Sequence, residues 1–575
     1  MSQASRWPAL LRLVLLASSP PLAAAFNNPP DVDIWCGKAY RATNASFNPG
    51  GWFEDTPYAD ADSSFRLTAK PRMSIYLDTD KTAAVLVDAV APSTANTSSN
   101  ADDLLVTISL GDITLGSASV AMGSSSNEVP VALASLSPQM DPYTLDITAT
   151  SLSTNATLYA TTANFSYLPY PDSYGSVARL DNLYGGTQAQ RGKNSSWVDI
   201  YPYTYYVQWS LYWDANVSTL NDFAATYNMI HIVPTGTLGD TPFPWAQFQP
   251  YLDRAAELGI WLQYDVLWTP DNVTSMVEQV TTLRTHPSIL SWYQSDEPDG
   301  KSNPLNATGL AYNTIKSIDP YHPISLALNC YDFYYSDYAA GADIITPDVY
   351  PISTNLTYST EYLTPCNATY GCCGCDDCGA GPTVFSDIAH RLDEFRRRDE
   401  LIGWAKTQWF APQAFGNETF WTRYPTAPEL AVMTLLGVNH GAKAIVNWDF
   451  PTTAELAGVT AQLAGLFNNS AVTSFLIGSP RTQDLGVVGG GGIVDAAVWV
   501  KEEEEENKTA LVSIVNLDYD AVSGPVTVAL PERLSVSGVK TNVWGNTTWT
   551  VEDGAITVAG GLDGLDVSVL IVTLG

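Results

Sequence analysis

One stretch of the sequence decides the fold: ILSWYQSDEP, at residues 289–298. It starts as an apolar run and ends abruptly in two adjacent carboxylates, Asp296 and Glu297, followed by a proline. Apolar side chains are what a strand covered on both faces of a parallel sheet needs. Pro298 cannot continue a central strand, so it marks the end of the strand. The two carboxylates are therefore expected at the carboxyl-terminal tip of a buried strand.

Strand-like and helix-like patterns alternate from about residue 195 to about residue 470, which is typical of a parallel sheet with crossover helices. We predict eight strands, at residues 200–208, 229–234, 260–266, 289–296, 324–329, 343–350, 402–410 and 444–449. Amphipathic helices are expected between them, for example at residues 248–258 and 273–283. Eight strand–helix units predict a (β/α)8 TIM barrel, whose functional groups occupy the carboxyl-terminal tips of the strands.

Both flanks of this region have a different pattern. Short alternating apolar runs are separated there by Ser, Asn, Gly and Pro, and helical periodicity is nearly absent. This pattern predicts a β-sandwich domain on each side of the barrel. The predicted organisation is a signal peptide at residues 1–25, an N-terminal β-sandwich at 26–175, the barrel at 176–474 and a C-terminal β-sandwich at 475–575.

The first residues have the pattern of a secretory signal. Arg6 and Arg12 accompany a short apolar core, and the small residues Ala23 to Ala25 offer a cleavage site before Phe26. Fourteen Asn-x-Ser/Thr sequons favour a glycosylated protein. We therefore expect a secreted protein, either extracellular or in the cell wall. No later segment is long and apolar enough to cross a bilayer, so no membrane span is expected.

The charge of the chain limits its partners. It has 27 Lys and Arg against 60 Asp and Glu, a net charge of −33. A chain with this balance offers no basic patch for phosphates, which excludes nucleic acid as a partner and favours a neutral or cationic ligand. There is no glycine-rich phosphate loop between a strand and a helix, and the few His residues do not pair at metal-ligand spacing. We expect neither a metal nor a cofactor.

Five of the seven cysteines crowd into residues 366–378, in the longest gap between predicted strands. In a secreted protein disulfides are favoured over a zinc site. Adjacent Cys372 and Cys373 could bond each other only with strain, so each needs its own partner. The disulfide candidates are Cys330, Cys366, Cys372, Cys373, Cys375 and Cys378, which leaves Cys36 as the odd one. We predict a disulfide-stapled loop on the carboxyl-terminal face of the barrel.

Carboxylates and aromatic residues gather at the predicted strand tips. The candidate binding residues are Asp265, Trp268, Trp292, Asp348, Tyr350, Gln408, Trp409, Trp448 and Asp449. Aromatic faces stack on the C–H face of a pyranose, and carboxylates bind hydroxyls and transfer protons. Two alternatives remain open for members of this set. Asp265 and Asp348 could instead cap the following helices, and Trp409 and Trp448 could belong to the core.

Residues 286–297, HPSILSWYQSDE, resemble the fourth-strand motif of clan A glycoside hydrolases, which are TIM-barrel enzymes. Those enzymes commonly end the strand in Asn-Glu, where the Glu is the general acid/base. The resemblance implies this role for Glu297, with Asp296 standing in place of the Asn. The Asp-Glu-Pro ending also resembles barrel hexosaminidases that use the acetamido group of their substrate. In those enzymes the Asp orients the acetamide and the Glu is the acid/base.

The sequence departs from the clan A pattern at the seventh strand. Clan A enzymes carry a nucleophilic Glu there, whereas this chain offers Gln408, with Glu418 as the nearest acid. Three explanations remain open. The substrate supplies the nucleophile with help from Asp296, or the enzyme inverts with a base such as Asp348 or Asp449, or the protein binds sugar without cleaving it.

These observations predict a secreted glycoside hydrolase that cleaves O-glycosidic bonds of a neutral carbohydrate with a carboxylic general acid/base. The expected partner is an oligosaccharide, a polysaccharide or a glycoconjugate. In this hypothesis Glu297 protonates the leaving oxygen, and Asp296 either positions the substrate or raises the pKa of Glu297 through its like charge. The alternatives are a substrate-assisted N-acetylhexosaminidase and a non-catalytic carbohydrate-binding or cell-wall protein. Oligomeric state is not predicted.

Overall fold

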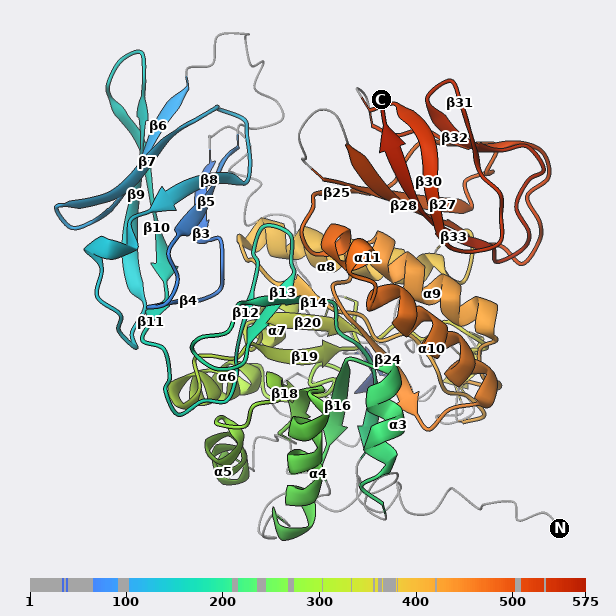
Figure 1. Cartoon of the computed structure of the whole chain (residues 1–575), viewed down its shortest axis with the longest axis horizontal. Coiled ribbons are helices and arrows are strands. Elements are labelled where there is room, and N and C mark those ends of the chain that lie inside the picture. The colour runs from blue at the N-terminus through green and yellow to red at the C-terminus, as the bar shows by residue number, and fades with distance from the viewer. Residues whose placement is uncertain are drawn as a thin grey trace.

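The structure is a computed structural model of the whole chain (Figure 1). The residues that it describes are 66–90, 103–208, 216–234, 245–266, 273–301, 303–331, 333–354, 357–359, 364–365, 379, 381–418, 421–501, 508–531 and 534–575, together with the strand pair β1 (Ile34–Trp35) and β2 (Lys38–Ala39). The predicted signal peptide, Trp268 and the cysteine segment at residues 366–378 lie outside the described residues.

Two antiparallel sheets form the N-terminal part of the described chain. The first has the order β10-β9-β6-β7 and the second β3-β5-β8. Their strands are β3 (Arg66–Pro71), β5 (Ala83–Val90), β6 (Leu104–Leu110), β7 (Ile113–Val120), β8 (Asn127–Val131), β9 (Tyr143–Ser151) and β10 (Thr157–Phe165). Alternate residues point inward, as Leu145, Ile147 and Ala149 do on β9, because successive side chains of a strand face opposite sides. This is the two-layered packing of a sandwich, with one apolar core between the sheets.

A small sheet connects this sandwich to the central region. It consists of β12 (Val177–Leu180), β13 (Thr187–Gln190) and β14 (Val198–Ile200), with a parallel pair of β4 (Tyr76–Leu77) and β11 (Tyr167–Leu168) beside it. Leu180 and Ala189 share a buried apolar cluster with Met229, Trp261 and Leu290, which lie at or near the first residues of three central strands. The small sheet therefore covers the amino-terminal end of the central sheet.

The central sheet is curled, parallel and eight-stranded, with the order β23-β20-β19-β18-β17-β16-β15-β24. The strands are β15 (Tyr203–Gln208), β16 (Met229–Val233), β17 (Trp261–Asp265), β18 (Ile289–Ser295), β19 (Ile324–Leu328), β20 (Ile344–Pro347), β23 (Thr407–Gln408) and β24 (Ile445–Phe450). The Phe410 N–H donates to Ala444 O at 3.0 Å, and the Val446 N–H donates to Phe410 O at 2.9 Å. Backbone pairing thus also joins the segment after β23 to β24.

Seven of the eight predicted strands coincide closely with observed ones, and the exception is the strand predicted at residues 402–410. Helix α8 (Ser386–Ile402) occupies the start of that range and ends at Gly403, whose φ of +80° forms the left-handed cap. Strand β23 begins only at Thr407 and is two residues long. The strand therefore begins later and is shorter than the sequence pattern suggested.

Helices cover the outer face of the curled sheet (Figure 1). They are α3 (Thr219–Thr226), α4 (Trp245–Leu258), α5 (Val273–Leu283), α6 (Ala307–Ile318), α7 (Tyr335–Ala339), α8, α9 (Ala427–Asn439), α10 (Ala454–Phe467) and α11 (Ser470–Leu476). Helix α4 buries Phe248, Tyr251, Leu252 and Ala255, the apolar face expected from the sequence. None of the described helices has both the length and the apolar character needed to cross a membrane.

A second pair of sheets forms the C-terminal domain, with the orders β25-β27-β28-β33-β30 and β26-β29-β32-β31. The strands are β25 (Arg481–Thr482), β26 (Val487–Val488), β27 (Val494–Val500), β28 (Thr509–Asn516), β29 (Val526–Val528), β30 (Val536–Trp544), β31 (Thr550–Glu552), β32 (Ala555–Val558) and β33 (Val567–Leu574). Trp499 and Leu511 pack in the same apolar cluster as residues of α9. The domain therefore rests on the helical layer, as Figure 1 shows at upper right.

Candidate active site

The alternation of side chains along each central strand decides which residues reach the inside of the curled sheet. On β16, Ile230 and Ile232 pack with the helices, whereas His231 between them lines a small inner cavity. On β17, Gln263 lines the same cavity while its neighbours Leu262 and Tyr264 pack outward. This follows from the two-residue period of a strand.

The inner cavity lies where the central strands end. The described residues that line it are Tyr206, His231, Gln263, Tyr293, Asp296, Ala327, Thr346, Asp348, Tyr350, Ala411, Val446 and Trp448. Its walls combine aromatic rings with carboxylates. This end of a parallel sheet is where ligands bind in folds of this architecture.

Glu297 follows β18 directly and has a left-handed backbone, with φ of +44°. Its Oε1 accepts a hydrogen bond from Asn329 Nδ2 at 3.1 Å, and Asn329 follows β19. Asp299 holds the two loops together, because its carboxylate accepts from the backbone N–H groups of Cys330 at 2.8 Å and of Asn329 at 3.3 Å. Burial raises the pKa of Asp299 to about 6, against the effect of these hydrogen bonds. Glu297 is thus held from the loop after the neighbouring strand β19.

Asp348, directly after β20, is buried beside Glu297. Burial and the adjacent Glu297 carboxylate, to which it hydrogen-bonds, raise the pKa of Asp348 well above its usual range. Neighbouring carboxyl groups disfavour ionisation of both, so Asp348 holds its proton more tightly than an isolated carboxyl group. A retained proton next to a carboxylate is the arrangement that general acid/base chemistry needs.

Asp296 has a different environment from its neighbour Glu297. Its Oδ1 accepts from the Tyr293 hydroxyl at 2.7 Å and its Oδ2 from Lys301 Nζ at 2.8 Å. Burial acts to raise the pKa of Asp296, but the Lys301 ammonium and these hydrogen bonds lower it below its ordinary value. Asp296 is therefore ionised, and the repulsion expected between adjacent carboxylates is offset by Lys301.

A hydrogen-bonded chain supports the opposite wall. His231 Nδ1 lies 2.7 Å from Gln263 Oε1, and Gln263 Nε2 donates to Ser325 Oγ at 2.7 Å. His231 Nε2 is buried without a hydrogen-bond partner among the described residues, and Asp265 Oδ2 lies 3.9 Å from it. This nitrogen is available to a ligand in the cavity.

Aromatic rings form the remaining wall. The rings of Tyr206 and Trp448 pack with centroids 3.9 Å apart, and Tyr350 stacks edge-on against Phe415 at 5.0 Å. Asp449 follows Trp448, and burial together with the nearby Glu418 carboxylate raises its pKa to about 7. Burial raises the pKa of Tyr206, and the charges of Asp265, Asp296 and Asp449 raise it further, so these carboxylates lie around one ring.

The structure brings together Asp265, Asp296, Glu297, Asp348, Tyr350, Trp448 and Asp449 from the predicted set. It does not bring Trp292 to the cavity. That ring is fully buried among the outer apolar residues, and its Nε1 donates to Asp319 Oδ2 at 2.8 Å. Its neighbour Tyr293 faces inward in its place, because adjacent strand residues point to opposite sides.

Two further predicted site residues lie at the wrong end of the sheet. Trp409 is fully buried in the apolar cluster near the first residues of the strands. Gln408 lines a different cavity, near the amino-terminal end. The residue of this segment that reaches the inner cavity is Ala411, and Glu418 is exposed. The position facing the cavity from the seventh strand therefore carries no acid.

Sequence analysis missed several residues of the site. Tyr293 and His231 could have been found from the sequence. Side chains alternate between the two faces of a strand, so one residue known to face inward places these two on the inner face. Asn329 directly follows a predicted strand, which was also a signal. Lys301 lies in a loop, and nothing in the local sequence indicated its ion pair with Asp296.

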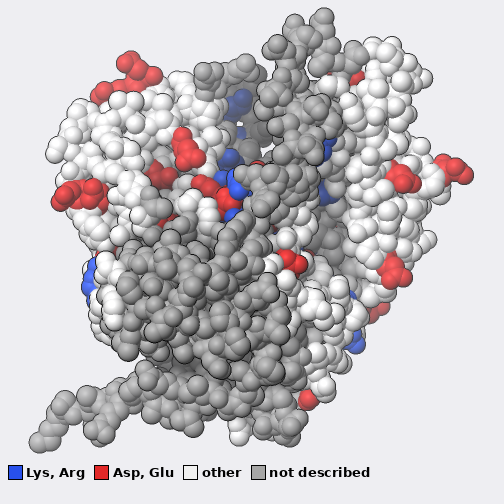
Figure 2. Space-filling model, turned by 180° about the vertical axis from the view of Figure 1, so that it is seen from behind, with Lys and Arg blue, Asp and Glu red and all other residues white. Residues whose placement is uncertain are grey.

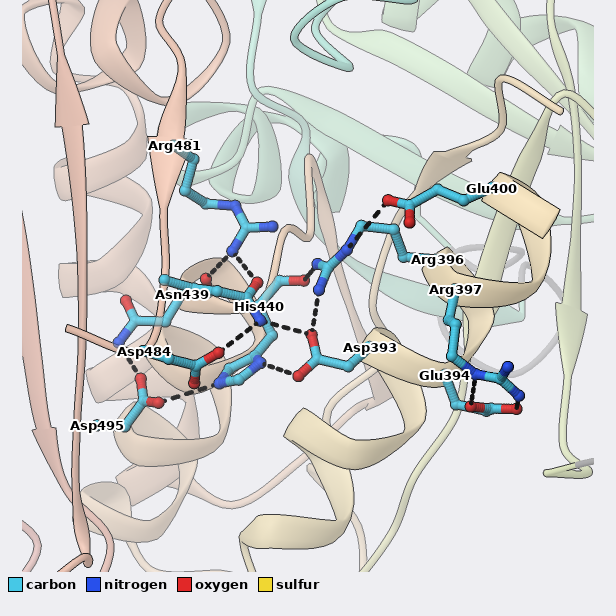
Figure 3. Close-up of polar contacts among 11 residues, drawn as sticks. Asp393, Glu394, Arg396, Arg397, Glu400, Asn439, His440, Arg481, Asp484 and Asp495 are labelled. Atoms are coloured by element: carbon cyan, nitrogen blue, oxygen red, sulfur yellow. Dashed lines mark hydrogen bonds and ion pairs between the residues drawn. The ribbon is translucent and has the colours of Figure 1, made fainter. Parts of the chain in front are cut away.

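One group among the described residues has the spacing of a metal site: His440, Asp484 and Asp495, whose ligand atoms lie within 4.8 Å of one another. None of the three lines the inner cavity, and Figure 3 shows them together with Asp393 and Arg396. His440 Nδ1 lies 2.8 Å from Asp393 and Nε2 lies 3.0 Å from Asp495. Burial acts to lower the pKa of His440, but these contacts raise it to about 9. His440, Asp393 and Asp495 thus form an ion-pair network.

A scan against protein-family models finds no match, and a search of curated proteins finds none either. Solved structures of glycoside hydrolases do match. A putative alpha-galactosidase from Bacteroides fragilis is 11% identical and has a TM-score of 0.42, with coverage of 89% of this chain and 97% of that chain. An FMN-binding beta-glucuronidase from Facaelibacterium prausnitzii is 11% identical and has a TM-score of 0.33, with coverage of 82% and 72%.

A beta-glucuronidase from Ruminococcus gnavus, solved with D-glucuronic acid, is 11% identical and has a TM-score of 0.31. The match covers 66% of this chain and 61% of that one, so this chain spans less than two thirds of that enzyme. Likeness at this level does not identify an activity. The function is therefore inferred from the geometry of the site.

Proposed function

We propose that the protein is a glycoside hydrolase whose curled sheet closes as a (β/α)8 barrel, with the Glu297–Asp348 pair as its acid. The observation that carries the proposal is the contact of the buried Asp348 carboxyl group with the half-buried Glu297 carboxyl group at the tips of β20 and β18. Such a pair holds one proton in a place where a glycosidic oxygen could receive it. The likeness of residues 286–297 to clan A enzymes supports the same role for Glu297.

The proposed reaction inverts the anomeric centre. Glu297 donates the proton that it shares with Asp348 to the leaving oxygen, and the bond from that oxygen to the anomeric carbon breaks. A water molecule attacks the same carbon from the other face and gives its proton to Asp449. Asp348 contacts the acid itself, so it cannot serve as the distant base. A carboxylate with a pKa of about 7, as Asp449 has, is well matched to base catalysis near neutral pH.

The proposed substrate is a neutral sugar. Tyr206, Tyr350 and Trp448 offer ring faces to a pyranose, and His231 Nε2 is placed to bind a hydroxyl. Lys301 is already paired with Asp296, and the other charged groups described around the cavity are carboxylates. A sugar acid would meet their repulsion. We keep an oligosaccharide, a polysaccharide or a glycoconjugate as the natural form of the substrate.

The acetamido-assisted alternative is less well supported than an ordinary glycoside. In that mechanism the Asp must accept a hydrogen bond from the acetamide. Both oxygens of Asp296 already accept hydrogen bonds, one from Tyr293 and one from Lys301. We therefore assign Asp296 a positioning role. Secretion, glycosylation and disulfides in residues 366–378 remain part of the proposal, supported by the sequence alone.

A panel of aryl glycosides, each paired with its N-acetylated and uronic counterparts, tests the proposal. We expect hydrolysis of a neutral member, with the product released in the inverted anomeric form as followed by proton NMR. Glu297→Gln should lower the rate by roughly 10²–10⁴, the usual contribution of a positioned acid. Glu552→Gln is the matched control, because Glu552 is exposed on β31 of the C-terminal domain.

Binding of an oligosaccharide without any hydrolysis would support the non-catalytic alternative. Activity confined to N-acetylated sugars would support the acetamido-assisted mechanism. Release of the product with retained configuration would remove Asp449 from the proposed role as base.

A further inference from the structure

A second cavity, of about 680 Å³, opens near the amino-terminal end of the central sheet, away from the carboxylate site. Five parts of the chain line it: the N-terminal sandwich at Lys70, the turn at residues 181–185, the segment around α8 and β23, the connection from α9 to β24 at Lys443, and the start of the C-terminal domain at Arg481. Figure 2 shows Lys and Arg side chains gathered in the hollow between the two sandwich domains. The volume is in the range of small-molecule sites.

The lining of this cavity is basic in a chain of net charge −33. The basic residues are Lys70, Arg396, Lys406, Lys443 and Arg481. The acidic residues are Glu128, Asp181, Asp399 and Glu400.

Most of these acids are already neutralised. Arg72, which lies beside the cavity, is ion-paired with both Glu128 and Asp181. Burial raises the pKa of Asp399 to about 7, so it is partly protonated at neutral pH. Positive charge therefore remains in excess in the cavity.

Lys443 is the most deeply buried of these cations, with 8% of its surface exposed. Its Nζ donates to Leu476 O at 2.6 Å. The ammonium has three N–H groups, and this is the single hydrogen-bond acceptor that the described residues offer to it. Burial and the nearby Arg481 guanidinium lower its pKa to about 7. Lys406 is similar, because its Nζ donates to Ala342 O at 2.5 Å and burial lowers its pKa.

Two guanidinium groups meet at Gly441 beside this lysine (Figure 3). A Cβ at Gly441 would lie 2.9 Å from Arg481 Nη2 and 3.7 Å from Arg396 Nη1. Arg481 donates to Asn439 O, and Arg396 donates to His440 O at 3.3 Å and to Asp393 Oδ1 at 2.7 Å. Both side chains are thereby fixed in position before any ligand arrives.

A purely structural role explains only part of this cluster. The end of α9 accepts hydrogen bonds from Arg396 and Arg481, and its carbonyl groups favour positive charge. It does not account for Lys443 and Lys406, whose hydrogen-bond acceptors are backbone carbonyl groups rather than carboxylates. Gln408 Nε2 and Ser479 Oγ also line the cavity, and both are buried without a hydrogen-bond partner among the described residues. All of these groups can donate to an oxyanion.

We propose that this cavity binds a small oxyanion, a molecule bearing a carboxylate or phosphate group, between Lys443, Lys406, Arg481 and Arg396. The bound anion would link the central sheet, the N-terminal sandwich and the C-terminal domain. It would neutralise charges that now repel one another, and so stabilise the folded chain by mass action. This site is separate from the proposed catalytic carboxylates.

Isothermal titration of the full-length protein with inorganic phosphate and with citrate, at constant ionic strength, tests the proposal. We expect saturable binding of at least one of them, and a rise in Tm that chloride at equal ionic strength does not produce. Lys443→Met should weaken the affinity at least about tenfold, a loss of roughly 1.4 kcal/mol. Lys508→Met is the matched control, because Lys508 is exposed and does not line the cavity.

Lys406→Met provides a second variant in case Lys443→Met does not fold, and the same weakening is expected. Absence of saturable binding to the wild-type protein at about 10 mM ligand would overturn the proposal, since the affinity would then be weaker than about 2.7 kcal/mol. Equal affinity in Lys443→Met or Lys406→Met and wild type would do the same. Glycosidase activity is not the readout, so the two proposals fail independently.

Discussion

Asn329 donates its side-chain amide to Glu297 at 3.1 Å although the two residues lie 32 positions apart. The contact joins the loops after β18 and β19, and Asp299 reinforces it through the backbone of Asn329 and Cys330. An acid held in this way needs little reorganisation when it transfers its proton.

The first prediction concerns Asp299. Asp299→Ala should remove the acceptor of three backbone N–H groups and lower the free energy of unfolding by about 1–3 kcal/mol. Because Asn329 would lose its support, kcat should fall more than KM changes. Denaturant unfolding and steady-state kinetics measure the two effects. Asp112→Ala, at an exposed turn residue, is the control, and equal behaviour of the two variants would contradict the positioning role.

The second prediction concerns the pH profile. Burial and the adjacent Glu297 carboxylate raise the pKa of Asp348 well above its usual range, so Asp348 keeps its proton to higher pH than an isolated carboxyl would. Asp348→Asn removes the group that holds this proton. The basic limb of the kcat/KM profile should therefore move downward in pH. An unchanged basic limb would show that Asp348 does not tune the acid.

The third prediction concerns Lys301. The Lys301 ammonium lowers the pKa of Asp296, against the effect of burial. Lys301→Met should raise that pKa, so Asp296 would be protonated over more of the acidic range. The acidic limb of the kcat/KM profile should then move upward in pH. Lys508→Met should leave the profile as it is, and the same result for Lys301→Met would mean that ionised Asp296 is not needed.

The fourth prediction concerns His440 and stability. Its folded pKa of about 9 exceeds the ordinary value of 6.5, so its stabilising contribution is complete below pH 6.5 and is lost as pH rises through 9. A difference of this size corresponds to about 3 kcal/mol. We therefore expect the wild type to have a higher free energy of unfolding than His440→Gln below pH 6.5. This difference should decrease as the pH rises through 9. A difference that stays constant from pH 6 to pH 10 would contradict the assigned protonation.

The fifth prediction separates core from site at Trp292. Trp292→Phe removes the donor to buried Asp319 and should lower the free energy of unfolding by about 1–3 kcal/mol. KM should not change, because the ring faces the helices rather than the inner cavity. A raised KM with unchanged stability would indicate instead that Trp292 contacts the substrate.

The sequence predicted the order of strands and helices because alternation and apolar periodicity are local properties. It also predicted that Asp296, Glu297 and Asp348 meet, since the carboxyl-terminal tips of parallel strands converge. It placed Gln408 wrongly because β23 begins only at Thr407, so Ala411, three residues beyond Gln408, is the residue that reaches the cavity.

The contacts between charged side chains in the site could not be predicted from the sequence either. Because Asp296 and Glu297 are adjacent in the sequence, we expected the charge of Asp296 to raise the pKa of Glu297. In the structure Lys301 neutralises Asp296, and the group that shares a proton with Glu297 is Asp348, 51 positions further on by their residue numbers. Contacts across loops depend on the tertiary fold, so local sequence rules cannot supply them.

The left-handed backbone of Glu297 has a consequence for protein engineering. At φ of +44° a residue with a Cβ carries about 1–2 kcal/mol of steric strain, which glycine avoids and asparagine reduces. Selection for heat resistance alone would therefore favour Gly or Asn at this position and discard the acid. Libraries screened for thermostability should be screened for turnover at the same time, because their most stable members at position 297 are expected to be inactive.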